Sequence, residues 1–282
     1  MKEILITDVD NTLFDWVDIW YRSFSAMLKK LCEILNVDPE DLYPSISEVH
    51  QKYGTSEYSF LLEELPEVRK VFSGNAIENV QPAIDAFREA RREALSLYPS
   101  VMATLTELKQ KGLTIVAYTE SQEFYTNYRF RKLGLDNVID YLYSPPDHTP
   151  KNKNTAKVRL YPTSNYSMAK TITKNTPAKE LKPNPDILLS IVAELGFSPD
   201  KAIYVGDSKM KDIAMAQEAG VEDAWAAYGQ AHHGPEYDLL KKVTHWTPEM
   251  VQREQSINNS GNTHISPTHV LKRQFSEIIH LI

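Results

Sequence analysis

From residue 99 onward, short apolar runs alternate with helical patterns, and this alternation restricts the fold of the chain more than any other feature. The runs that suit buried strands are Leu113–Tyr118, Val138–Tyr143, Ala202–Val205 and Ala224–Ala227, and a helical pattern precedes each of them. Strands joined by helices form parallel sheets through right-handed crossovers, with helices on both faces. The sequence therefore predicts an α/β fold with a parallel sheet.

The first part of the chain adds one strand and a long helical region. Residues 4–6 form a further apolar run that suits a buried strand of the same sheet. Residues 16–97 show helical periodicity without the alternation of a strand, and Asp38 followed by a proline predicts a helix start within them. We therefore expect an all-helical domain at 16–97, inserted into a sheet domain formed by residues 1–15 and 98–282.

Two stretches do not follow this pattern. Residues 144–180 are rich in Pro, Asn, Thr and Lys, with seven basic residues against two acids, and a connection of this length is usually functional or disordered. A small hairpin between Val158–Tyr161 and Tyr166–Met168 is expected inside it. A tail from about residue 231 holds six of the eight histidines, and its last helix is expected to run from Val270 to Ile282.

Composition argues against several classes of function. The net charge of -7 disfavours broad binding to nucleic acids or anionic membranes. The single cysteine, Cys32, excludes an internal disulfide and a metal site of several thiolates, and it fits a reducing compartment. No segment approaches the ~20 apolar residues that span a bilayer, and the chain opens directly into a strand, so we expect a cytoplasmic protein. The oligomeric state is left open.

Polar residues stand where the expected strands end. Asp8 and Asp10 follow the first apolar run, Thr119 follows a second, and Asp207 follows a third, with Lys182 opening a helix. Ligands of open α/β sheets bind outside the carboxyl ends of the strands, so these side chains are expected to converge. On its own, the first pair of aspartates is more typical of a strand running into an Asx turn. The interpretation as a functional site therefore depends on Thr119, Lys182 and Asp207, which are expected to lie near the two aspartates.

Four motifs in this order resemble the haloacid dehalogenase-like (HAD) superfamily. They are D-x-D-x-T from Asp8 to Thr12, the threonine Thr119 after an apolar strand, Lys182 in K-P-x-P, and G-D-S-x-x-x-D ending at Asp212. They span most of the chain. The resemblance implies a Rossmann-like core, and it identifies the helical insertion as a cap that closes over the site and selects the substrate.

The resemblance also assigns roles to these residues. Asp8 is the expected nucleophile, which forms an aspartyl-phosphate, and Asp10 is the acid that protonates the leaving oxygen and then activates water. Asp8 and Asp207 are expected to bind Mg²⁺ through carboxylates and Asp10 through its backbone carbonyl, with Asp212 beside them. The residues expected to contact the phosphate are Asp8, Thr12, Thr119, Glu120 and Lys182.

Three details extend or weaken this interpretation. Glu120 stands where many relatives carry Asn or a small residue, so its charge points either toward the phosphate or away from it. The adjacent His232 and His233 are a weak zinc candidate without regular ligand spacing, and surface positions are favoured. The candidates for the entrance to the site lie just past the first strand, and they are Asp15, Trp16, Asp18 and Trp20.

We therefore expect a Mg²⁺-dependent phosphatase that acts on a small phosphorylated metabolite, such as a sugar phosphate, a phosphoglycolate-like acid or a nucleotide. Dehalogenases do not keep the second acid, because a halide needs no proton, so Asp10 favours phosphate esters. One alternative is a phosphomutase, which passes the phosphoryl group to a second hydroxyl. Another is a weakly catalytic protein of the same fold that binds a partner through residues 144–180 and the tail.

Overall fold

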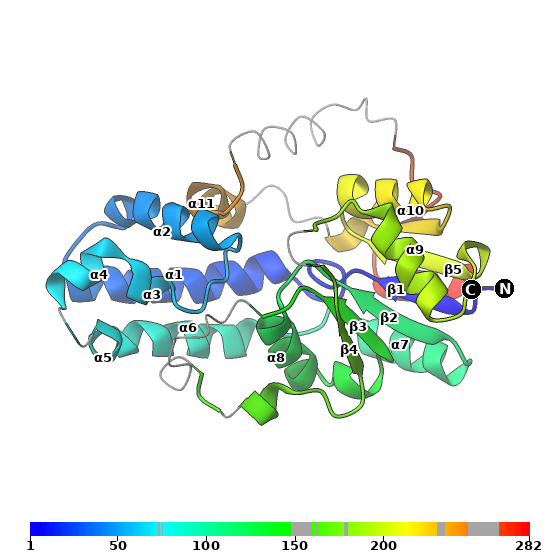
Figure 1. Ribbon diagram of the computed structural model, residues 1–282, viewed down its shortest axis with the longest axis horizontal. Coiled ribbons are helices and arrows are strands. Elements are labelled where there is room, and N and C mark those ends of the chain that lie inside the picture. Colours follow the sequence, from blue (N-terminus) through cyan, green and yellow to red (C-terminus); the bar gives the residue numbers. More distant parts are fainter. Residues whose placement is uncertain are drawn as a thin grey trace.

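The protein consists of a helical part and a sheet part, which lie side by side in Figure 1. The structure is a computed structural model, and it describes the following residues: 1–72, 74, 76–147, 159–161, 163–177, 180–229, 235–247 and 265–282. Within these residues, no helix has the length and apolar character needed to cross a membrane. The predicted division into domains, 16–97 against 1–15 with 98–282, stays a prediction.

The described strands form one parallel sheet of seven, so the predicted α/β class is confirmed. The strands are β1 (Ile4–Thr7), β2 (Thr114–Tyr118), β3 (Tyr141–Ser144), β4 (Ile172–Asn175), β5 (Ala202–Gly206), β6 (Glu222–Ala226) and β7 (His269–Leu271). Their spatial order is β4-β3-β2-β1-β5-β6-β7. The chain therefore builds the sheet outward on both sides of β1, and β1 pairs with β2 and β5.

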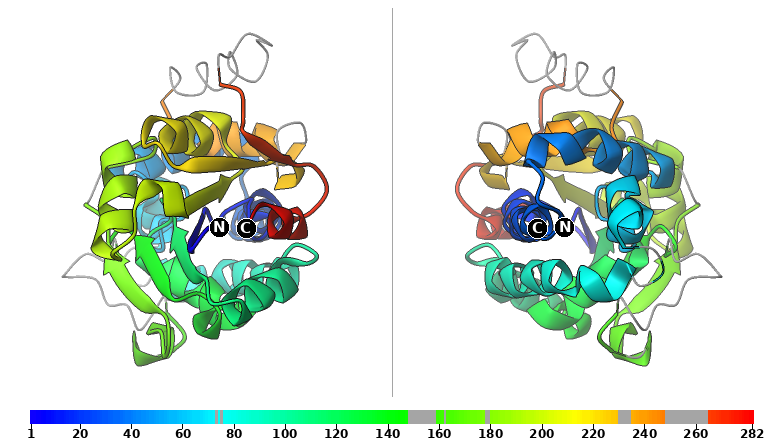
Figure 2. Two further views of the ribbon diagram at one scale, coloured as in Figure 1. Left: turned by 90° about the vertical axis from the view of Figure 1, so that its right-hand side faces the viewer. Right: turned by 90° about the vertical axis from the view of Figure 1, so that its left-hand side faces the viewer.

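Helices cover both faces of the sheet, as the end-on view in Figure 2 shows. The covering helices are α7 (Val101–Gln110), α8 (Glu123–Leu133), α9 (Pro185–Glu194) and α10 (Ala214–Glu218). Alternate residues of β1 point to opposite faces. Leu5 packs in one core cluster with residues of α7 and α8, whereas Ile4 and Ile6 pack in another with residues of α9 and α10. This double burial explains why the strands read as continuous apolar runs.

The helical part has its own apolar core. Its helices are α1 (Trp16–Leu35), α2 (Pro39–Tyr53), α3 (Leu61–Glu64), α4 (Pro66–Val71), α5 (Ala76–Asn79) and α6 (Gln81–Ala94). The long helix α1 begins after Asp15, whose Oδ1 accepts a hydrogen bond from the backbone N–H of Asp18 at 2.8 Å. Trp20, Phe24 and Leu28 lie on its buried face.

The segment after β6 returns to the helical part. Helix α11 (Pro235–Val243) packs against α1 and α2, and its buried residues Tyr237, Leu240 and Val243 belong to the core of the helical part. The chain then comes back to the sheet as β7. The single helix expected from Val270 to Ile282 is wrong, because Val270 pairs with Trp225 in β7 and a 3-10 helix starts only at Phe275.

Part of the basic segment 144–180 also joins the sheet. Residues 172–175 form the edge strand β4, and a 3-10 helix spans Thr163–Tyr166. The predicted hairpin is therefore wrong for residues 166–168, which are not a strand. It is also wrong for residues 159–161 of its first arm, which are not a strand, and Val158 lies outside the described residues. His232 and His233 also lie outside them.

Candidate active site

The candidate residues gather at the carboxyl ends of β1, β2 and β5. Asp8 directly follows β1, Thr119 follows β2, and Asp207 follows β5. The backbone N–H of Asp8 donates to the carbonyl oxygen of Val205 at 2.8 Å, which continues the pairing of β1 with β5 by one residue. This edge of the sheet is the point where the strand order reverses, and ligands of open α/β sheets bind there.

Asp8 is held by a lysine and a hydroxyl. Lys182 Nζ lies 2.6 Å from Asp8 Oδ1, and the Thr12 hydroxyl donates to Asp8 Oδ2 at 3.1 Å. Lys182 stands just before α9, and the residue next to it, Pro183, follows a cis peptide bond. Its ammonium also contacts Asp212 Oδ1 at 3.0 Å. All four side chains are nine-tenths buried or more.

Asp212 reaches the site through an irregular helix. Residues Lys209–Ile213 form a π-helix, whose hydrogen bonds span one residue more than those of an α-helix. Asp212 Oδ2 accepts the backbone N–H of Ser208 at 3.0 Å, and Oδ1 accepts the Tyr204 hydroxyl at 2.9 Å. A Cβ atom on Gly206 would lie 2.4 Å from Asp212 Cγ. Glycine at 206 is therefore required for Asp212 to pack here.

The acids outnumber the buried cation that faces them. Carboxylate oxygens of Asp8, Asp207 and Asp212 all lie within 4.8 Å of one another, and one lysine contacts two of these residues. Burial, opposed by Lys182 and reinforced by Asp212 and Asp10, raises the pKa of Asp8 to about 7. Burial and Asp8 raise the pKa of Asp207 well above its ordinary value. A set of crowded, hard oxygen donors with excess negative charge fits Mg²⁺.

Asp10 has different surroundings, although it is only two residues from Asp8. Its Oδ2 accepts hydrogen bonds from the hydroxyls of Ser121 at 2.5 Å and Thr119 at 3.3 Å. Its Oδ1 lies 3.5 Å from Nη1 of Arg129, a fully buried residue of α8. Burial raises the pKa of the Asp10 carboxyl, against the lowering effect of the Arg129 guanidinium. The two aspartates are thus held by separate sets of partners.

The carboxylate of Glu120 binds groups of the protein itself. Its Oε1 accepts the backbone N–H of Lys182 at 2.8 Å, and its Oε2 pairs with Lys211 Nζ at 2.6 Å. Although burial opposes it, Lys211 and Lys182 hold the pKa of Glu120 below its ordinary value. Of the two directions open from the sequence, the structure favours a carboxylate bound to these lysine residues. Contact with phosphate stays a prediction.

A known protein family matches most of this chain. Residues 2–220 match the haloacid dehalogenase-like hydrolase family. The chain is a haloacid dehalogenase-like hydrolase. The predicted family is confirmed, and with it the assignment as a hydrolytic enzyme.

Phosphatases are found among the relatives of this hydrolase. A glyceraldehyde 3-phosphate phosphatase of Methanopyrus kandleri is 23% identical over 227 residues, which are 78% of this chain and 82% of that protein. A phosphoglycolate phosphatase of Nitrosococcus oceani is 22% identical over 243 residues, or 82% and 86% of the two chains. The crystal structure of a HAD phosphatase from Thermococcus onnurineus has a TM-score of 0.52 at 16% identity, covering 100% of this chain and 98% of that one. The last likeness shows the fold alone.

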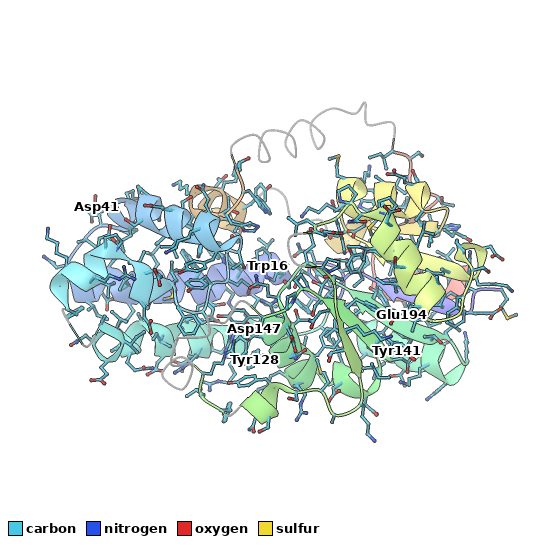
Figure 3. All side chains as sticks on the ribbon, viewed as in Figure 1. Trp16, Asp41, Tyr128, Tyr141, Asp147 and Glu194 are labelled. Carbon is cyan, nitrogen blue, oxygen red and sulfur yellow. The ribbon has the colours of Figure 1, made fainter. Side chains whose placement is uncertain are left out.

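Some residues of the site of this hydrolase were not expected from the sequence. Arg129 and Ser121 contact Asp10, and Glu57 of the helical part pairs with Arg129. Two of the residues expected at the entrance have structural positions. Trp20 is buried in the core of the helical part, and the Asp15 side chain caps the N-terminus of α1. Trp16 lies where the helical part meets the sheet part (Figure 3).

Proposed function

We propose that this hydrolase removes the phosphoryl group from small phosphate monoesters through an aspartyl-phosphate on Asp8, with Mg²⁺ bound beside it. The phosphatase names of its relatives support the reaction class. The observation that carries the proposal is the separation of the two aspartates. Asp8 lies with Lys182 and the acids after β5, whereas Asp10 lies with hydroxyls after β2. Carboxylates with such different surroundings are suited to different roles.

In the first half of the reaction, Asp8 forms a bond to phosphorus while the bond to the ester oxygen breaks. Asp10 supplies the proton that the leaving oxygen needs, and the alcohol departs. In the second half, Asp10 removes a proton from a water molecule, which attacks the phosphorus. The P–O bond to Asp8 breaks, inorganic phosphate leaves, and both carboxyl groups return to their starting state.

The other buried groups act on charge. The transferring phosphoryl group is stabilised by fixed positive charge and hydrogen-bond donors rather than by further covalent chemistry. Lys182 and the hydroxyls of Thr12 and Thr119 are among the donors that lie next to the two aspartates. Lys182 also offsets the repulsion between Asp8 and Asp212, which keeps both carboxyl groups in place.

Asp8, Asp207 and Asp212 would hold Mg²⁺, with the backbone carbonyl of Asp10 as a further oxygen ligand. The bound cation supplies positive charge, which keeps these carboxylates ionised and neutralises the phosphate oxygens. Without such charge, the raised pKa of Asp8 leaves part of this group protonated near neutral pH, and a protonated carboxyl is a poor nucleophile.

The test is phosphate release from a panel of small phosphate esters, with Mg²⁺ and with EDTA. Glyceraldehyde 3-phosphate and phosphoglycolate stand first in the panel, followed by sugar phosphates and nucleoside monophosphates. Asp8→Asn removes the nucleophile with little change of shape. Asp41→Asn is the matched control, because Asp41 is exposed at the far end of the helical part (Figure 3).

We expect Mg²⁺-dependent turnover by the wild type and by the control, and none by Asp8→Asn. Turnover by Asp8→Asn at the wild-type rate would remove Asp8 as the nucleophile. If the wild type releases no phosphate from any ester, the phosphatase proposal fails. Transfer of the phosphoryl group to a second hydroxyl of the substrate, followed by ³¹P NMR, would then identify a phosphomutase.

A further inference from the structure

Arg129 is a buried cation at the side of Asp10. It belongs to α8, its side chain is 2% exposed, and it is among the largest fully buried side chains of the molecule. Its Nη1 lies 3.5 Å from Asp10 Oδ1, and its Nη2 pairs with Glu57 Oε1. The rings of Phe14 and Tyr125 flank the guanidinium at 5.7 and 5.8 Å. A cation in such surroundings is stable only when carboxylates compensate its charge.

The polar atoms of Arg129 are only partly satisfied by hydrogen bonds. Its Nε and Nη1 atoms, and Oδ1 of Asp10, are buried without a hydrogen-bond partner among the described residues. An apolar side chain of similar volume would fill the same space without this cost. The residue therefore contributes something other than packing, and the group that it faces across 3.5 Å is Asp10.

The carboxyl of Asp10 is held from two sides. Its Oδ2 accepts the hydroxyls of Ser121 and Thr119, which follow β2. Its Oδ1 faces only the guanidinium of Arg129 among the described residues. Rotation of the carboxyl about its Cβ–Cγ bond would move one oxygen away from two hydroxyls and the other away from the positive charge. Arg129 therefore helps to fix the orientation of the Asp10 carboxyl, with Oδ1 toward the guanidinium and Oδ2 toward the two hydroxyls.

Glu57 approaches Arg129 from the helical part of the molecule. It lies between α2 and α3, and hydrogen bonds fix the position of the preceding residue, Ser56. The indole Nε1 of Trp20 donates to the carbonyl oxygen of Ser56 at 3.1 Å, and the Ser56 hydroxyl lies 3.0 Å from His245 Nδ1. The Glu57–Arg129 pair therefore joins the helical part to α8.

We propose that Arg129, oriented by Glu57, is a positioning residue for Asp10. Together the two residues hold the carboxyl in the orientation from which its proton passes to the ester oxygen as the P–O bond breaks. The proposal rests on the proposed function, in which Asp10 is the acid. It adds that the orientation of this acid depends on a residue contributed by the helical part.

The test compares two substrates that differ in their need for a proton. An alkoxide is a poor leaving group without protonation, whereas p-nitrophenolate leaves without it. The parameter is kcat/KM, which reports the steps up to formation of the aspartyl-phosphate. It is measured for glycerol 3-phosphate and for p-nitrophenyl phosphate in Arg129→Met, Arg129→Lys and Glu57→Gln.

Two control variants match the changes of charge. Arg131→Met removes an exposed arginine of α8 that pairs with Asp136 at 3.6 Å, and Glu33→Gln removes an exposed glutamate of α1 that pairs with Lys30 at 2.8 Å. Asp10→Asn gives the reference for complete loss of the acid. Thermal unfolding of every variant separates loss of folded protein from loss of proton transfer.

We expect Arg129→Met and Glu57→Gln to lower kcat/KM for glycerol 3-phosphate by about tenfold or more relative to p-nitrophenyl phosphate, because a misoriented catalytic group loses about this much. Asp10→Asn shifts the ratio in the same direction and further, and both controls leave it unchanged. Arg129→Lys keeps the charge and loses the planar fork, so its ratio lies between those of the wild type and Arg129→Met. If Arg129→Met does not fold, Glu57→Gln, which keeps the shape of the side chain, gives the answer.

Two results would overturn the proposal, and they differ from each other. Equal losses on both substrates in the Arg129 and Glu57 variants, with Asp10→Asn still selective, would make the pair purely structural and leave the proposed function intact. An unchanged ratio in Asp10→Asn itself would show that Asp10 is not the acid, and both proposals would then fail.

Discussion

Stability of this hydrolase at acid pH is expected to depend on His50. This residue of α2 is 1% exposed, and its Nδ1 lies 2.5 Å from the carbonyl oxygen of Val243 at the end of α11. Burial lowers the pKa of His50 from its ordinary 6.5 to about 4, with the hydrogen bond to Val243 opposing this effect and His245 adding to it. In the unfolded chain the imidazole regains its ordinary pKa.

The sign and size of the effect follow from these two values. Between pH 6.5 and pH 4 the unfolded state binds a proton that the native state does not bind. The contribution of a neutral His50 to the free energy of unfolding is therefore complete above pH 6.5 and is lost as the pH falls toward 4. The difference in pKa corresponds to about 3 kcal/mol in total, of which about 2 kcal/mol is lost by about pH 5.

Urea unfolding of the wild type and His50→Asn, followed by tryptophan fluorescence, measures this loss. Asparagine keeps a donor close to the position of Nδ1 and does not titrate. Between about pH 8 and pH 5, we expect the wild type to lose about 2 kcal/mol more than His50→Asn. His280→Asn, at an exposed position, is the control and should behave like the wild type. Equal losses in the wild type and His50→Asn would refute the reasoning, because burial would then not keep the imidazole neutral.

Three further outcomes are expected. Lys182→Met leaves Asp8 and Asp212 buried without their cation, so the free energy of unfolding in urea should fall by about 3–5 kcal/mol. Added Mg²⁺ should recover part of this loss, and no effect of Mg²⁺ would argue against metal binding at these carboxylates. Gly206→Ala should displace Asp212 and weaken Mg²⁺ binding by calorimetry, while circular dichroism stays native; unchanged affinity would contradict this. Asp136→Ala removes the acceptor of the backbone N–H groups of residues 169–171, so amide exchange there should become faster than in Arg131→Met.

Most of the sheet and of the site was predictable, because both depend on local signals. Strands β1, β2 and β5 are buried apolar runs, which can be recognised in the sequence without knowing which strands pair with them. Asp8, Thr119 and Asp207 directly follow such runs, so the rule that parallel strands end at one edge already brings them together. Lys182 was found from a motif, since its contact with Asp8 spans 174 residues and no local pattern encodes it.

The unpredicted features depend on contacts between distant residues. Arg129 and Arg131 look alike in the sequence of α8, yet one is buried against Asp10 and Glu57 and the other is exposed. The apolar positions of α11 predict that one face of this helix is buried. They do not indicate that the face packs against α1 and α2 rather than against the sheet. The helix expected from Val270 begins too early, because Val270 is an apolar residue of the edge strand β7 and not part of a helix.

The position of β1 between β2 and β5 explains how two aspartates in one motif come to have different partners. Asp8 meets groups that follow β5 and groups that precede α9, which are acids and a lysine. Asp10 meets the hydroxyls that follow β2 and the arginine of α8. Glu57 pairs with Arg129 of α8, so this residue of the helical part contacts the site on the β2 side. If the proposed roles hold, changes on the β5 side should alter metal binding and nucleophilic attack, whereas changes in the helical part should alter proton transfer.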